Sequence, residues 1–78
     1  MARPKGVRCE AFWDGQNLTV RRGGAVLHIQ PAGSLLEALN ELVDFQMAME
    51  VTGWKTRRFV VFEEARRGRW AVWLYRRS

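Results

Sequence analysis

Residue types that often hold small folds together are scarce in this sequence, which has one cysteine, one histidine and two prolines among 78 residues. Cys9 has no second cysteine with which to form a disulfide, and no Cys/His cluster is present to bind a structural metal. We therefore expect no metal and no cofactor. A chain without disulfides is typical of a reducing compartment, so we expect the protein in the cytoplasm.

Long apolar runs are also missing. No stretch reaches the roughly 20 apolar residues that cross a membrane, and the basic segment 1–6 is not followed by the apolar core of a signal peptide. We expect no association with membranes and a flexible basic tail over residues 1–6. Because 47% of the residues are hydrophobic, the chain can bury a small core, and the sequence predicts a single domain over residues 1–78.

No recognisable catalytic constellation is present. His28 lies in the middle of a predicted strand, and neither Cys9 nor any serine is placed to form a nucleophile–base pair with it. Glu63 and Glu64 are adjacent, so in a strand they point to opposite faces and cannot act as one carboxylate pair. The glycine pair at 23–24 lacks the Lys-Ser/Thr of a phosphate-binding loop. We therefore expect a protein without enzymatic activity.

The segment 34–53 is the only one with sustained helical periodicity. Ser34 can cap its first turn, Glu37 can return to the backbone N–H of Ser34 as in a capping box, and Gly53 offers a left-handed stop. At about 100° per residue the segment has a broad apolar face and an opposite polar face. The apolar face comprises Leu35, Leu36, Ala38, Leu39, Leu42, Val43, Phe45 and Met49, and the polar face comprises Glu37, Asn40, Glu41 and Asp44.

The other segments show the alternation that is typical of strands. Turn residues separate the first three, with glycines at 15, 23 and 24 and a proline at 31. The run 59–62 is apolar at every position, as in a strand covered on both faces, and 65–68 predicts a tight basic turn. The predicted strands are 7–13, 18–22, 25–30, 58–63 and 69–76.

The element order β-β-β-α-β-β predicts an α+β domain, with one amphipathic helix packed on one face of a mainly antiparallel sheet. One helix of roughly 27 Å covers a single face of five strands, so aromatic and basic residues must lie on the other. We expect that second face to carry Phe12, Trp73 and Tyr75, with one of the phenylalanines, among Arg8, Arg21, Arg69 and Arg77.

Aromatic rings offer stacking platforms, and guanidinium groups pair with phosphates or carboxylates. Such a face can hold single-stranded nucleic acid, or it can anchor an acidic protein surface. Two structural alternatives stay open: the sheet can curl so that these residues form a second small core, or two copies can pair through them.

Charge is distributed unevenly along the chain, whose net charge is +5. No Lys or Arg occurs between Arg22 and Lys55, a gap that contains the whole predicted helix and half of the acidic residues. If the helix covers one face of the sheet, the domain has an acidic side and a basic side. The alternative is ordinary solubilising charge.

Two further surfaces are candidates for binding. The basic turns around 21–24 and 66–69 can contact a phosphate backbone, although turns select polar residues whatever their function. The acidic row Glu37, Glu41 and Asp44 is either a solvated helix face or a mimic of a phosphate row for a basic partner.

The helix end Gln46-Met47-Ala48-Met49-Glu50, followed by an aromatic turn and two closing strands after a strand-hairpin opening, resembles the layout of small phage-encoded anti-CRISPR proteins that inhibit type I systems. The resemblance implies a compact, non-enzymatic inhibitor acting in the host cell cytoplasm, and it carries over no site residue. Members of that group are often acidic. This chain departs from them in its +5 charge, which favours acidic protein patches or bound nucleic acid as partners.

Two functions are therefore predicted for the basic aromatic face. The first is a non-catalytic inhibitor or adaptor that docks on a protein or ribonucleoprotein complex, and the second is a nucleic-acid-binding module or small regulator. A subunit of an obligate dimer is a third possibility. The candidate binding residues are Arg8, Phe12, Arg21, Arg22, Arg66, Arg67, Arg69, Trp73, Tyr75 and Arg77.

Overall fold

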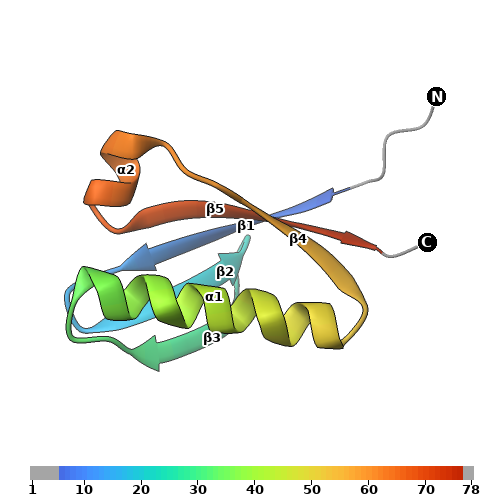
Figure 1. The fold of residues 1–78 in the computed structure, drawn as a ribbon, viewed down its shortest axis with the longest axis horizontal. Helices are drawn as coiled ribbons and strands as arrows, with labels where there is room; N and C mark the ends of the chain where they lie inside the picture. Colours follow the sequence, from blue (N-terminus) through green and yellow to red (C-terminus); the bar gives the residue numbers. More distant parts are fainter. Residues whose placement is uncertain (1–5, 77–78) are drawn as a thin grey trace.

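Five strands and two helices form over residues 6–76, which are the residues that this computed structural model describes, without the side chains of residues 59 and 62 (Figure 1). Three strands come first along the chain, and a long helix, a strand, a short helix and a last strand follow. In order they are β1 (Gly6–Trp13), β2 (Asn17–Arg22), β3 (Ala25–Pro31), α1 (Leu35–Val51), β4 (Trp54–Phe59), α2 (Phe62–Arg66) and β5 (Arg69–Arg76).

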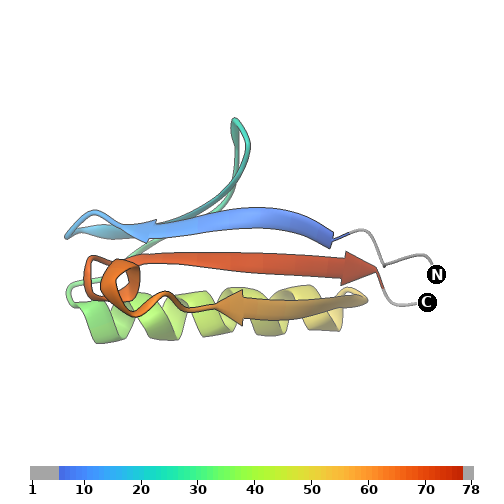
Figure 2. The same cartoon turned by 90° about the horizontal axis from the view of Figure 1, so that it is seen from above.

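The strands form one antiparallel sheet in the order β3-β2-β1-β5-β4, with β1 and β5 side by side at its centre. α1 lies along one face of the sheet, and α2 sits at one end of β5 (Figure 2). The predicted α+β architecture, one main helix on one face of an antiparallel sheet, is therefore confirmed.

α1 begins and ends at the residues that its sequence indicates. The Ser34 hydroxyl accepts a hydrogen bond from the Glu37 backbone N–H at 3.1 Å, which is the expected N-cap. The Glu37 carboxylate, however, accepts from the backbone N–H of Gly33 at 2.7 Å and not from that of Ser34. At the other end Thr52 is the C-cap, and Gly53 adopts a φ of +98° that favours glycine. The predicted helix is confirmed with its N-cap at Ser34 and its stop at Gly53, whereas the return contact of Glu37 is made to Gly33 and not, as predicted, to Ser34.

The core lies between α1 and the near face of the sheet, and its buried strand residues come from β1, β2 and β5. Small side chains on β1 face larger ones on β5, since Cys9 is paired with Val72 and Ala11 with Trp70. The small side chains on β1 leave room for the larger ones on β5 within the core. The buried hydrophobic residues are Cys9, Ala11, Leu18, Val20, Ala32, Ala38, Leu42, Phe45, Trp70, Val72 and Leu74.

The apolar face predicted for α1 is only partly buried. Leu42 is completely buried, whereas Leu36 and Val43 are 68% and 37% exposed. The apolar residues of this helix span a wider arc than one sheet can cover, so the prediction that Leu36 and Val43 are buried is wrong. Glu41 contacts His28 of β3, and helical spacing places Glu37 and Asp44 on the same side of α1. This acidic row therefore lies on the flank of the helix beside β3 and does not alone form the side facing water.

The segment between α1 and β5 also differs from the prediction. β4 covers Trp54–Phe59, and the following residues form α2 in place of a continuation of the predicted strand 58–63. Glu63 and Glu64 lie in the first turn of α2, where carboxylates stabilise the N-terminus of a helix. The predicted basic turn is thus mostly the last turn of α2, and Gly68 closes it with a φ of +77°.

The predicted tail over residues 1–6 falls largely outside the described residues, because residues 1–5 are not described and Gly6 begins β1. Within residues 6–76, neither helix is long and apolar enough to cross a membrane.

The orientation of α1 predicts that substitutions at two adjacent residues lower the free energy of unfolding by very different amounts. Leu42→Ala removes a fully buried side chain and is expected to lower the free energy of unfolding by about 2–5 kcal/mol. Val43→Ala trims a side chain that faces water and is expected to cost less than about 1 kcal/mol. Urea denaturation followed by tryptophan fluorescence measures both, and equal losses would contradict this orientation of the helix.

Candidate functional site

Strand alternation places a set of aromatic and charged side chains on the sheet face opposite α1, which we call the outer face. Because Cys9, Val72 and Leu74 point into the core, their neighbours along β1 and β5 point to the opposite side. The register then adds residues of β2 and β4. The outer face comprises Arg8, Glu10, Phe12, Arg21, Lys55, Arg57, Arg69, Ala71, Trp73 and Tyr75.

The centre of the outer face is a tryptophan between two arginines. Trp73 on β5 is the register partner of Arg8 on β1 and also of Arg57 on β4. Adjacent strands lie about 4.8 Å apart, so register places an arginine on the neighbouring strand at each side of Trp73. In the next row, Tyr75 is paired with Lys55. Rings and cations therefore alternate across the three strands.

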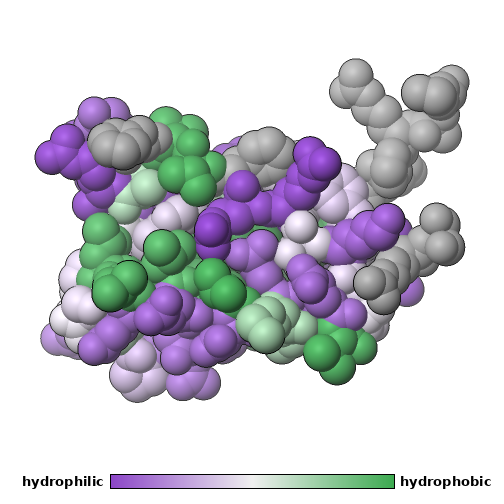
Figure 3. Space-filling view, in the orientation of Figure 1, coloured by the Kyte–Doolittle hydropathy of each residue, from purple (hydrophilic) through white to green (hydrophobic). Residues whose placement is uncertain are grey.

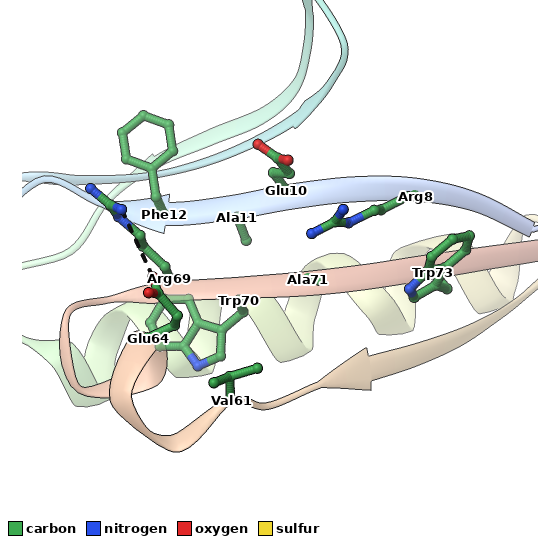
Figure 4. A pocket seen from close by; sticks show the side chains of 10 residues that line it. All are labelled: Arg8, Glu10, Ala11, Phe12, Val61, Glu64, Arg69, Trp70, Ala71 and Trp73. Atoms are coloured by element: carbon green, nitrogen blue, oxygen red, sulfur yellow. Dashed lines mark ion pairs between the residues drawn. The ribbon is translucent and has the colours of Figure 1, made fainter.

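A pocket of about 650 Å³ opens next to this row. Its two ends are formed by Trp73 with Arg8 and by Phe12 with Arg69, and the small Ala71 between them leaves space above the sheet (Figure 4). Val61 forms a further part of the wall from the connection between β4 and α2. The pocket is thus bounded by rings, aliphatic groups and guanidinium groups, with few acceptors.

Two carboxylates also line the pocket. Glu64 on α2 lies 3.8 Å from the Arg69 guanidinium, and both side chains are well exposed, so the pair holds them only weakly (Figure 4). Glu10 lies on β1 opposite Ala71 and beside Arg21 of β2. Among the described residues of the sheet, Glu10 is the one carboxylate on the outer face, surrounded by cations.

Gly6 allows the two central rings to lie close to the sheet. A Cβ atom at this position would lie 2.8 Å from Cε1 of Tyr75 and 2.9 Å from Cε3 of Trp73. Real Cβ atoms do not approach other atoms so closely, so the rings of Tyr75 and Trp73 occupy the space that a side chain would need. Glycine at the start of β1 therefore sets the position of both rings.

Most of the predicted site residues meet on this face. Arg8, Phe12, Arg21, Arg69, Trp73 and Tyr75 are all brought together there. Phe59 and Phe62, one of which was expected beside them, have side chains outside the described part of the structure, as has Arg77.

Three predicted residues lie elsewhere. Arg22 ends β2 on the side of the buried residues, where its charge acts on Cys9. Arg66 ends α2 and Arg67 follows it, both exposed. Figure 2 shows the turn between β2 and β3 rising away from α2, so the two basic turns do not form one surface.

Lys55 and Arg57 were missed by the sequence analysis because the fourth strand was expected to begin at residue 58. The signal that reveals them is the alternation of Trp54, Thr56 and Arg58 with Lys55 and Arg57, directly after the helix stop at Gly53. With the strand begun at Trp54, both cations fall on the same face as Trp73.

The histidine and the thiol lie away from the pocket, on the helix side of the sheet. The Nε2 atom of His28 is 3.5 Å from a carboxylate oxygen of Glu41, and its ring packs 5.6 Å from that of Phe45. Burial raises the pKa of the Cys9 thiol, and the charge of Arg22 offsets this in part, so the thiol stays protonated. No group of three or more His, Cys, Asp or Glu that suits a metal ion occurs within residues 6–76.

The packing at Gly6 gives a prediction with a matched control. Gly6→Val is expected to displace the rings of Trp73 and Tyr75, to change the near-ultraviolet circular dichroism, and to lower the free energy of unfolding by about 1–3 kcal/mol. Gly24→Val makes the same change where a Cβ meets no atom within 4 Å, and it is expected to leave the spectrum unchanged. A more stable Gly6→Val protein would contradict the contact, since valine otherwise favours a strand.

What the outer face can bind follows from its chemistry: flat rings for stacking, and guanidinium groups for phosphates or carboxylates. No protein-family model, curated protein or solved structure matches the chain.

Proposed function

We propose that this protein is a non-catalytic binding protein of the cytoplasm whose outer face holds single-stranded nucleic acid. The observation that carries the proposal is the row Arg8–Trp73–Arg57, in which register places an arginine on each side of a central indole. A base stacked on such a ring leaves its phosphates beside the ring, within reach of the flanking guanidinium groups.

The charge of the surface supports this proposal. Arg8, Arg21, Lys55, Arg57 and Arg69 spread positive charge over four adjacent strands of the outer face. A phosphate backbone that crosses the strands meets a cation at each one, which suits an extended polyanion better than a single compact anion. α1, on the other side of the sheet, has no Lys or Arg and is turned away from such a ligand.

The pocket between Trp73 and Phe12 adds a place for one base beside the stacking row. Its volume of about 650 Å³ exceeds that of a nucleobase, and its walls are rings and aliphatic groups. Glu10 and Glu64 supply acceptors for the amino groups of a base. Single strands are favoured over duplexes because only unstacked bases offer a ring face to Trp73 and Phe12.

The prediction of an inhibitor docked on a protein or ribonucleoprotein complex, as in the anti-CRISPR resemblance, stays a prediction. The two functions differ in their dependence on salt. Contacts with phosphates release counterions, so affinity falls steeply with salt, whereas a protein interface depends on a few buried anchors and falls less.

Fluorescence anisotropy with labelled single-stranded RNA, single-stranded DNA and duplex DNA at about 50 and 200 mM salt tests the proposal. We expect the single strands to bind more tightly than the duplex. The logarithm of the affinity is expected to fall with the logarithm of salt by roughly 0.7 for each phosphate contact. Equal weak binding of all three, lost at the higher salt, would contradict the proposal and favour a protein target.

Variants locate the binding surface. Arg8→Ala combined with Arg57→Ala is expected to lower affinity and to reduce the salt slope by roughly 0.7 for each arginine. Arg66→Ala combined with Arg67→Ala removes the same charge from α2 and its end, and it is expected to change affinity much less.

Replacement of the central ring separates stacking from charge. Trp73→Ala is expected to weaken binding by roughly 1–3 kcal/mol, while Trp73→Phe retains a flat ring and recovers most of the loss. If the double substitution at 66 and 67 weakens binding as much as that at 8 and 57, the outer face is not the site.

A further inference from the structure

The side of α1 that faces away from the sheet carries exposed apolar residues, which we call the helix ridge: Leu36, Val43 and Met47. Leu36 and Met47 are 68% and 58% exposed, and all three lie within a narrow arc of the helix. Figure 3 shows hydrophobic surface running along α1 and again above it, near the β4–α2 connection. Apolar groups gathered on one surface in this way mark a site of interaction.

A groove of about 430 Å³ separates the helix ridge from that connection. Val43 and Met47 form one wall, and Val60, 55% exposed, forms the other. Hydrogen bonds join α1 to β4 beside the groove, because Gln46 of α1 donates to the Thr56 hydroxyl at 2.9 Å and accepts from Arg58 at 3.4 Å.

Acidic residues flank the helix ridge on both sides. Glu41 contacts His28 of β3, and helical spacing places Glu37 and Asp44 on the same side of α1. On the other side Glu50 lines the groove itself, together with Arg58 of β4. None of the 17 residues of α1 is a lysine or arginine. An apolar stripe bordered by carboxylates is complementary to an apolar stripe bordered by cations.

We propose that the helix ridge and its groove bind a basic amphipathic helix of a partner protein. The apolar side chains of that helix fill the groove between Met47 and Val60, and its lysines or arginines face the flanking carboxylates. A second copy of this chain fits less well, since it would bring the two acidic flanks together. A nucleic acid or an anionic membrane would be repelled by the same carboxylates. The surface lies on α1, away from the outer face, so this proposal does not depend on the proposed function.

Two designed peptides of equal length test the proposal: one of leucine and lysine, patterned with one apolar and one cationic helix face, and its leucine–glutamate counterpart. The ¹³C-methyl NMR signal of Met47 is the reporter, and the half-buried Met49 is the internal reference. We expect the lysine peptide to shift the Met47 signal in a saturable way. The glutamate peptide, and a lysine peptide of the same composition in a scrambled order, are expected to leave it unchanged.

Substitutions on α1 then separate apolar from electrostatic contacts. Val43→Ser combined with Met47→Ser is expected to raise the Kd of the lysine peptide roughly tenfold or more, measured by calorimetry. Asp44→Asn combined with Glu50→Gln is expected to raise it roughly 2- to 10-fold, with a weaker dependence on salt. Leu27→Ser combined with Ile29→Ser trims exposed apolar residues on β3, and it is expected to leave the Kd unchanged.

Three results would overturn the proposal. The first is an unchanged Kd in the Val43→Ser and Met47→Ser protein, and the second is equal binding of the lysine and glutamate peptides. The third is a dimer in sedimentation of the protein alone, with a Met47 signal that moves with protein concentration, which would assign the helix ridge to a second copy.

Discussion

β1 lies between β2 and β5, and its pairing with β5 joins the two ends of the described chain at the centre of the sheet. Both faces depend on this one pairing. On the helix side it sets Cys9 and Ala11 of β1 beside the larger Val72 and Trp70 of β5, and all four are buried in the core. On the outer face it sets Gly6 against Tyr75 and Arg8 against Trp73. A slip of one residue would exchange the two faces and would destroy core and candidate site together.

The same geometry explains why one face is left open. α1 is the one helix in the described chain that lies along the sheet, and its contacts run from β4 to β3 across a single face. α2 has five residues and reaches only one end of β5. The rings of Trp73 and Tyr75 on the far side therefore lie close to the backbone at Gly6, and both side chains are partly exposed.

The sequence predicted the helix α1 and the strand β5 because their signals, periodicity and capping residues, act between residues that are close in the chain. The period of the helical segment, the cap at Ser34 and the stop at Gly53 all act within a few residues, so α1 was predicted with its ends. The alternation of β5 likewise gave both of its bounds and its outward Trp73 and Tyr75. The arginine and aromatic residues of the outer face could be predicted for the same reason.

Features that depend on distant packing could not be predicted. The apolar run 59–62 has no period, so nothing local indicated that the strand ends at Phe59 and that a helix follows. The strand was centred on this run and begun at residue 58, so Lys55 and Arg57 were missed although their alternation is a local signal. The arc of apolar residues on α1 is wider than a sheet can cover, and periodicity cannot say which part of such an arc is buried. Leu36 and Val43 were misplaced for that reason.

The two-residue connection between β4 and α2 contributes to the walls of both the pocket and the groove. Val61 lines the pocket on the outer face, and Val60 lines the groove beside α1. The two residues are adjacent in the chain. A ligand that displaced this connection on entering the pocket would therefore also change the shape of the groove, and the reverse would hold for a ligand of the groove. Thermodynamic linkage makes such an effect mutual: each ligand then changes the affinity for the other by the same factor. Adjacent residues of one short segment thus take part in the walls of two binding surfaces on opposite sides of the sheet.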